Sequence, residues 1–177
     1  MKLVLDIETQ NSFQEAGSRQ DMSLLKVSVA ACYWYQDDKY YVFFEDELDS
    51  LKNLISQAEY IIGFNTIGFD LPILQQYMKD LNLLNKKQID MMLILEDILG
   101  YKIPLQAVAQ ATLGKHKISH GLEAINMWKQ GRLDELKEYC QDDVRLTREI
   151  YEYGIKHNKI KFNAGWLNYD VPVSWPG

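Results

Sequence analysis

Apolar residues gather in short runs along the first third of the chain, and turn-forming residues separate these runs. Short runs rich in Val, Ile, Leu and aromatic residues are typical of β-strands. This pattern predicts strands at residues 2–9, 26–35, 39–44 and 60–64. Residues 36–38, Gln-Asp-Asp, form a turn, so the second and third strands are expected to pair as a hairpin.

The apolar spacing becomes helical after the last of these strands. The tripeptide Asp70-Leu71-Pro72 has an acid at the N-cap position and proline in the first turn, which predicts a helix over residues 70–84. Further helices are predicted at residues 91–99, 104–112, 121–130 and 133–157. One earlier helix, capped by Asp49 or Ser50, is expected to end at about residue 58.

The order of strand, hairpin, helix, strand and several helices is that of an α/β protein with a mixed central sheet flanked by helices. The hairpin gives antiparallel pairs, whereas the crossover to residues 60–64 gives the first strand a parallel neighbour. A length of 177 residues suits one domain, expected at residues 1–160. Residues 161–177 carry two tryptophans, two prolines and two glycines and are expected to form an irregular tail.

Composition adds few constraints. The two cysteines, Cys32 and Cys140, are too few for a disulfide framework or a zinc site. No signal peptide opens the chain, and no apolar run approaches the ~20 residues needed to cross a bilayer, so a cytoplasmic protein without a membrane partner is expected. The net charge of −6 argues against nonspecific coating of nucleic acid, but not against a nuclease, because bound cations offset carboxylates.

At three places in the chain, acids stand where the packing pattern calls for apolar groups, and the first of these places holds a pair. In the first strand, Asp6 and Glu8 lie two residues apart and therefore on one face, roughly 6–7 Å apart at their bases. Two anions held this close are costly unless they are protonated or bridged by a metal ion. Taken alone, this pair is better explained as a solvated strand end.

The second such place is Asp143, which lies inside the apolar stripe of the long last helix. That stripe comprises Leu136, Tyr139, Cys140, Val144, Thr147, Ile150 and Tyr151. Residues four apart share a helix face, so Tyr139 lies next to Asp143 on this stripe, whereas Asp142 points further outward. A buried carboxylate needs a base or a metal ion as its partner. A structural salt bridge with Lys137 or Arg145 is the alternative to a metal site.

The third such place is Asp70, which lies where a strand gives way to a helix. It is interpreted as a helix cap, and this does not compete with a functional role, because strand-to-helix junctions are also where α/β proteins place sites. Asp90 has a similar position before the helix predicted at residues 91–99. It is interpreted as the cap of that helix rather than as a catalytic residue.

Three short motifs contain these acids and together resemble the DEDD superfamily of 3′→5′ exonucleases. Residues 6–9, Asp-Ile-Glu-Thr, resemble its first motif. Residues 65–70, Asn-Thr-Ile-Gly-Phe-Asp, resemble the second, and residues 139–143, Tyr-Cys-Gln-Asp-Asp, resemble the third in its tyrosine form. The Tyr-Cys start is especially similar to the exonuclease domains of B-family DNA polymerases. The resemblance covers residues 1–155 and does not extend to the tail.

The resemblance implies a ribonuclease H-like fold and two divalent ions, Mg²⁺ or Mn²⁺. It implies that Asp6 bridges the two ions, that Glu8 and Asp143 bind the first, and that Asp70 serves the second. Carboxylate oxygens are the ligands that such hard cations prefer. Two such ions can stabilise the attacking and leaving oxygens of a phosphoryl displacement. Tyr139, with an ordinary pKa of about 10, is a poor base and is implied to orient the attacking water.

Substrate contacts are expected around the same motifs. Thr9 and Asn65 are expected to contact the substrate, Asn65 through hydrogen bonds near the metal ions. Phe69 is expected to stack on a base, as aromatic residues do in single-strand enzymes, and core packing is its equal alternative. Lys117 lies in a loop before a predicted helix whose N-terminus is suited to a phosphate.

The sequence therefore predicts a metal-dependent 3′→5′ exonuclease that acts on single-stranded nucleic acid, with DNA favoured and RNA as the alternative. A catalytically inactive nucleic-acid-binding module of the same fold is the rival class, and the presence of all four acids and the tyrosine counts against it. An endonuclease of this fold agrees less well with the third motif. A calcium-binding structural domain would need a contiguous loop of alternating acids, which the sequence lacks.

Overall fold

A mixed sheet of five strands forms the centre of the protein, in the order β3-β2-β1-β4-β5. The computed structural model describes residues 1–17, 21–115, 121–164 and 167–175. The strands of this sheet are β1 (Lys2–Thr9), β2 (Val27–Trp34), β3 (Lys39–Phe44), β4 (Tyr60–Gly63) and β5 (Lys87–Asp90). β2 pairs antiparallel with β1 and β3, whereas β4 pairs parallel with β1 and β5. The predicted α/β class, the mixed sheet and the hairpin are confirmed.

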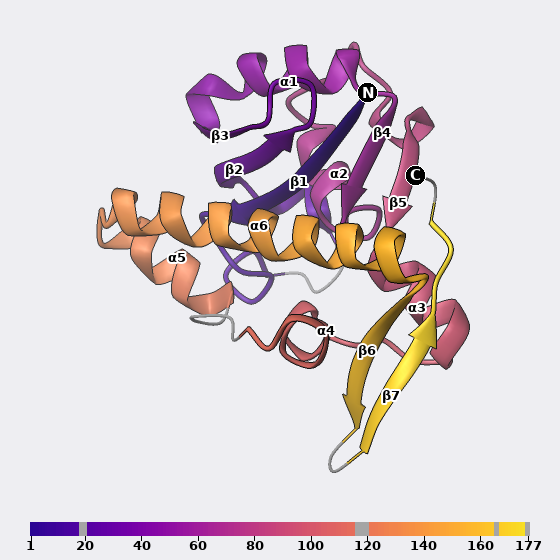
Figure 1. The fold of residues 1–177 in the computed structure, drawn as a ribbon. Helices are drawn as coiled ribbons and strands as arrows, with labels where there is room; N and C mark the ends of the chain where they lie inside the picture. The colour runs from indigo at the N-terminus through magenta and orange to yellow at the C-terminus, as the bar shows by residue number, and fades with distance from the viewer. Residues whose placement is uncertain (18–20, 116–120, 165–166, 176–177) are drawn as a thin grey trace.

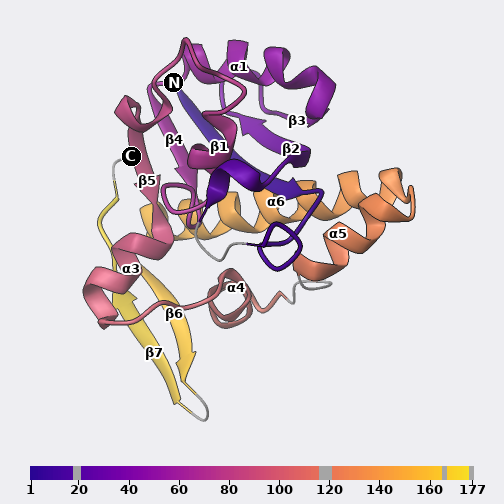
Figure 2. The ribbon, with the colours of Figure 1, turned by 180° about the vertical axis from the view of Figure 1, so that it is seen from behind.

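Helices cover both faces of the sheet. Their bounds are α1 (Leu48–Gln57), α2 (Asp70–Leu74), α3 (Met91–Leu99), α4 (Leu105–Leu113), α5 (Gly121–Lys129) and α6 (Leu133–His157). Figure 1 shows α6 lying across the strands, and the view from behind in Figure 2 shows α5 beside it. The last four helices begin and end within one residue of the predicted bounds. Among the described residues, no helix combines the length and apolar character needed to span a bilayer.

The alternation of side chains along β1 decides which residues meet α6. Leu3, Leu5 and Ile7 are buried on one face, in a core that includes residues of α1 and α2. Val4 is buried on the other face, in the core that contains the apolar stripe of α6. Burying each leucine contributes roughly 1.5–3 kcal/mol, so a shift of register by one residue is strongly disfavoured. Even-numbered residues of β1 therefore face α6.

The helix predicted over residues 70–84 is shorter than expected and ends at Leu74. The side chain of Gln75 supplies hydrogen bonds that replace a continued helix. Its amide nitrogen donates to the carbonyl oxygens of Met78 (2.9 Å) and Leu81 (2.8 Å), and its oxygen accepts from the Leu83 amide (3.0 Å). The predicted cap of α1 is also wrong, because that helix begins at Leu48, after a short 3-10 turn.

The expectation of an irregular tail at residues 161–177 is wrong. Two antiparallel strands, β6 (Lys159–Ala164) and β7 (Leu167–Pro172), form a hairpin beside α4 (Figure 1). Alternate residues of the hairpin are buried in the core beside α6, and this alternation was hidden among aromatic and turn-forming residues. Trp175 then returns to α6, where its indole nitrogen donates to the Tyr151 carbonyl oxygen at 3.1 Å. Gly154 makes room for the indole ring, since a Cβ there would lie 2.2 Å from it.

Candidate active site

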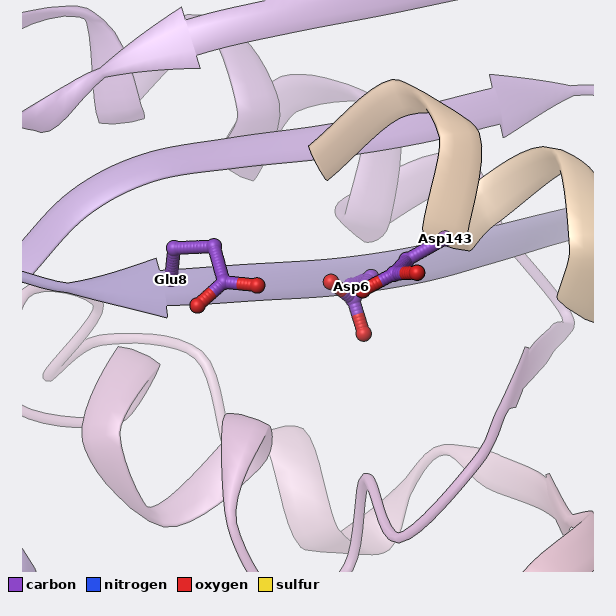
Figure 3. A group of neighbouring side chains, drawn as sticks. All are labelled: Asp6, Glu8 and Asp143. Atoms are coloured by element: carbon purple, nitrogen blue, oxygen red, sulfur yellow. The ribbon is translucent and has the colours of Figure 1, made fainter. Parts of the chain in front are cut away.

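Three carboxylates from two distant parts of the chain meet beside the central strand. Asp6 and Glu8 come from β1, on the face turned to α6, and Asp143 comes from α6 (Figure 3). One oxygen of each lies within 4.8 Å of the others. Asp6 and Glu8 are half-buried, whereas Asp143 is only 3% exposed. Three anions at this spacing repel one another in a poorly hydrated environment, and this arrangement suits a divalent cation.

The neighbouring acid of α6 has different surroundings. Asp142 forms an ion pair with Arg145 at 2.8 Å near the surface. Lys137, the other base considered as a partner for Asp143, places its ammonium 4.8 Å from the centre of the Phe44 ring. The apolar stripe of α6 is buried as the spacing predicted, and Asp143 is buried with it. The structure thus brings Asp143, rather than Asp142, to the β1 carboxylates.

Asp70 lies beside this group and is attached to the same strand. It is the first residue of α2, it is 3% exposed, and its Oδ1 accepts a hydrogen bond from the Ile7 amide at 2.9 Å. Ile7 lies between Asp6 and Glu8, so this hydrogen bond fixes the start of α2 against the acidic part of β1. The residue that precedes α2 is Phe69, which makes no side-chain cap.

Asp90 holds the segment that leads to Asp70. Its Oδ1 accepts from the Asn65 amide (2.8 Å) and from two amides in the first turn of α3, and its Oδ2 accepts from the Ile67 amide (2.9 Å). The prediction that Asp90 caps this helix is confirmed. Asn65 has a φ of +71°, a left-handed conformation that asparagine tolerates better than most residues. At Gly68 a Cβ would lie 2.6 Å from the Asn65 side-chain oxygen, so glycine allows this close approach.

Burial changes the protonation of Asp70. The pKa of this carboxyl rises from an ordinary 3.8 to about 7, chiefly because burial penalises the charged form. The hydrogen bond from the Ile7 amide opposes this rise, and the negative charges of Asp90 and Asp143 add to it. Without a cation, Asp70 is therefore substantially protonated near neutral pH.

We expect the metal-free protein to lose stability as the pH rises from about 4 to about 7. The raised pKa of Asp70 means that the folded state binds a proton that the unfolded state releases, so this contribution to the free energy of unfolding is complete below the unfolded pKa. It declines as the pH rises and is lost above the folded pKa. Asp70→Asn cannot titrate and should remove this part of the decline. Urea unfolding in EDTA at several pH values measures how the free energy of unfolding changes with pH in wild type and in Asp70→Asn. Asp142→Asn is the control and should show the same pH dependence as wild type. Equal slopes for wild type and Asp70→Asn would contradict the raised pKa.

The four carboxylates line a cleft of about 500 Å³. Phe13, Phe64 and Phe69 give it an aromatic side, and the Phe13 and Phe69 rings pack edge to face with their centres 6.3 Å apart. The aliphatic part of the lining comes from the core beside α1 and α2 and from helices α4 and α5: Ile7, Leu25, Leu105, Leu122 and Ile125. A short polar rim completes the lining: Thr9, Asn11, Ser12 and Asn65.

The other predicted site residues differ in whether they line the cleft. Thr9, Asn65 and Phe69 all line the cleft, and the Thr9 hydroxyl donates to the Asn11 carbonyl oxygen at 3.0 Å. Tyr139 is buried in the core one turn before Asp143 and is not among the described residues that line the cleft. Lys117 lies outside the described residues.

Sequence reasoning missed several residues of the site. Phe13 is an isolated aromatic residue in a polar stretch, and Leu122 is a leucine at the start of a helix. These two features of the sequence could have indicated that the residues belong to the site. Cys140 was interpreted as a core residue, yet its Sγ lies 3.6 Å from the Asp6 main-chain oxygen and 3.8 Å from the Asp6 carboxylate. Burial raises the pKa of the Cys140 thiol well above its ordinary value, so the thiol keeps its proton and can donate it.

Comparisons with known proteins agree with this fold. The family B DNA polymerase of the hyperthermophilic archaeon Pyrobaculum calidifontis is similar in structure, with a TM-score of 0.65 at 19% identity over 87% of this chain. The similar region makes up 24% of that polymerase, so the chain spans about a quarter of its length, and at this identity the likeness concerns the fold alone. A search of curated proteins gives no match. The family model RNase_H_2, of the RNase H superfamily, matches residues 3–155. The chain therefore belongs to the RNase H superfamily, whose members are generally phosphodiester hydrolases.

Proposed function

We propose that the protein is a divalent-metal-dependent 3′→5′ exonuclease, which hydrolyses nucleotides from the free 3′ end of single-stranded DNA. The observation that carries this proposal is the group formed by Asp6, Glu8 and Asp143, whose oxygens lie within 4.8 Å of one another in an open cleft. Asp70 at the same cleft completes the acids of the DEDD motifs. Membership of a superfamily of phosphodiester hydrolases supports the reaction type.

The donor set is suited to Mg²⁺ or Mn²⁺, because every proposed ligand is a carboxylate oxygen. Asp6, Glu8 and Asp143 would hold one ion, and Asp6 and Asp70 a second. When bound, such ions supply charge that stabilises the oxygens of a phosphoryl group during displacement. The buried position of Asp143 fits this role, since a charged carboxylate that is 3% exposed requires compensation.

The protein's own groups would position the reactants. The hydrogen bond from Ile7 holds Asp70 against β1, and Asp90 holds the segment before Asp70 through the amides of Asn65 and Ile67, so the acids keep their spacing without a substrate. Tyr139 shares the inward stripe of α6 with Asp143, and its hydroxyl is proposed to orient the attacking water. With an ordinary pKa of about 10, tyrosine suits this role better than that of a general base.

Two features support a single-stranded substrate. A cleft of about 500 Å³ has the scale of a small-molecule pocket, so it encloses individual nucleotides rather than a double helix. Phe13 and Phe69 provide aromatic surface at this cleft, which suits the faces of unpaired bases. The choice of DNA over RNA rests on the motif resemblance to B-family polymerases and on the fold of the archaeal enzyme, which is a DNA polymerase. RNA is the alternative substrate.

A hydrolysis assay tests the proposal. Single-stranded DNA and RNA of matched sequence, labelled at the 5′ end, are incubated with the protein and with Mg²⁺, Mn²⁺ or EDTA. We expect a ladder of shortened products with either cation, stronger for DNA, and none with EDTA. A 3′ end blocked against hydrolysis should stop the degradation, because the enzyme would begin only at that end.

Each contrary outcome identifies what is wrong. Undiminished hydrolysis in EDTA would rule out the metal-dependent mechanism, and cuts in a circular strand would indicate an endonuclease. Faster degradation of the RNA strand would reverse the substrate preference. Binding of the labelled strands without any hydrolysis would support an inactive nucleic-acid-binding module instead.

A further inference from the structure

Two residues of α5, Leu122 and Ile125, belong to the aliphatic side of the cleft, and they differ in how far they are exposed. Ala124, Ile125 and Met127 are each 8% exposed or less and hold the helix in the core. Leu122, in the first turn, is 70% exposed and lines the cleft. A leucine this exposed contributes little to folding, so its apolar surface is available to a ligand in the cleft.

An ion pair between α5 and the segment after β1 indicates which face of the helix meets the cleft. Lys129, the last residue of this helix, pairs with Glu15 in the segment that follows β1. Residues 122, 125 and 129 are three and four positions apart, so Leu122, Ile125 and Lys129 share one face of the helix. The helix therefore turns this face toward the segment that carries Phe13, which also lines the cleft. Figure 2 shows α5 and that segment side by side.

The chemistry of the cleft lining indicates where each part of a nucleotide would bind. Among the described residues that line the cleft, none is a lysine or an arginine, so this described part of the lining presents carboxylate, apolar and uncharged polar groups. The aromatic and aliphatic side chains suit an uncharged, flat surface. In a nucleotide that surface is the base, while the phosphate belongs at the carboxylates and their cations.

From this geometry we infer that Leu122 is a substrate-contacting residue, which packs against the base of the 3′-terminal nucleotide. This inference rests on the proposed function, because it places the strand end in the cleft with the four acids. The contact is apolar and makes no hydrogen bond to the base edge, so it should hold any of the four bases. It should be present before and during hydrolysis, and it therefore contributes to binding more than to the chemical step.

Kinetics with a matched control variant test this role. Leu122→Ala should raise KM for single-stranded DNA about fivefold and leave kcat within about twofold, the pattern expected when uniform binding is lost. Leu84→Ala is the control, because Leu84 is 53% exposed and lies outside the cleft, and it should change neither constant. The melting temperatures of both variants should stay close to that of the wild type. Unchanged KM in Leu122→Ala would overturn the inference.

A substrate without the terminal base gives a sharper comparison. With an abasic residue at the 3′ end, wild type and Leu122→Ala should show the same KM, and a persistent fivefold difference would overturn the base contact. Binding of a 5′-fluorescent strand in EDTA, measured by anisotropy, separates this inference from the proposed function, since it needs no hydrolysis. If wild type binds DNA in EDTA but does not degrade it after Mg²⁺ or Mn²⁺ is added, the proposed function fails, while the dissociation constants of wild type and Leu122→Ala still decide the role of Leu122.

Discussion

Asp143→Asn should lower the rate of hydrolysis by about a hundredfold or more, whereas Asp142→Asn should stay close to the wild-type rate. Asp143 is 3% exposed and lies within 4.8 Å of the β1 carboxylates, so an amide there would remove a charged ligand from the proposed metal site. Asp142 has no comparable position, because it pairs with Arg145 at the surface. Single-turnover rates on a 5′-labelled strand with saturating Mn²⁺ measure both variants.

The two substitutions form a matched pair, since they change the same chemical group at adjacent positions. The loss of a near-surface pair such as Asp142–Arg145 costs about 0–1 kcal/mol, so Asp142→Asn should fold. Asp143→Asn keeps the size of the side chain and removes a charge from a buried position, so it should fold as well. Tyr139→Phe keeps the ring that packs in the core and removes only the hydroxyl, so its rate should be intermediate and its metal affinity largely kept. A dead Asp142→Asn beside an active Asp143→Asn would mean that the third motif has been assigned the wrong register.

The sequence predicted best those elements whose apolar pattern is long or strictly alternating. The helix expected at residues 133–157 is present with those bounds, because its buried stripe repeats over 25 residues. The first strand was equally clear, since Leu3, Leu5 and Ile7 require one face and thereby assign Asp6 and Glu8 to the other. These two elements alone position the three carboxylates that meet in the structure.

The elements that the sequence did not predict depend on side-chain hydrogen bonds and long-range packing, which the apolar periodicity does not indicate. The early end of α2 follows from three hydrogen bonds of Gln75, and a polar residue at that point of a helical pattern gives no sign of them. The hairpin of β6 and β7 is buried partly because Thr112, far away in sequence, exchanges two hydrogen bonds with the main chain of Lys161. Neither contact has a local signature.

The candidate site could likewise be predicted from the sequence only in part. Three of the acids could be grouped from element geometry, but the attachment of Asp70 to the Ile7 amide, and with it the raised pKa, required the position of α2 against β1. The cleft itself was not foreseeable, because it joins the segment after β1 to α4 and α5. Phe13 and Leu122 therefore gained a proposed role only when these segments were seen to line one cavity.

Mn²⁺ should stabilise the folded protein, and Asp6→Asn should abolish most of that effect. A ligand that binds only the folded state adds about 2.7 kcal/mol at a hundred times its dissociation constant. For a chain of this size we expect the melting temperature to rise by roughly 5–10 °C. The carboxylate of Asp6 belongs to the group within 4.8 Å, so its replacement by an amide removes a charged ligand from that group.

The metal-free state gives the same substitution a second, opposite effect. Without cations, Asp6, Glu8 and Asp143 repel one another, so Asp6→Asn should unfold at an equal or higher temperature than wild type in EDTA. The variant would thus be the more stable protein without metal and the less stable one with Mn²⁺. Thermal unfolding in EDTA and in excess Mn²⁺ gives the melting temperatures of wild type and Asp6→Asn under both conditions. Asp142→Asn is expected to respond as wild type does. An equal rise in wild type and Asp6→Asn would mean that Mn²⁺ binds elsewhere, since general destabilisation by the substitution lowers both temperatures and cannot reverse their order.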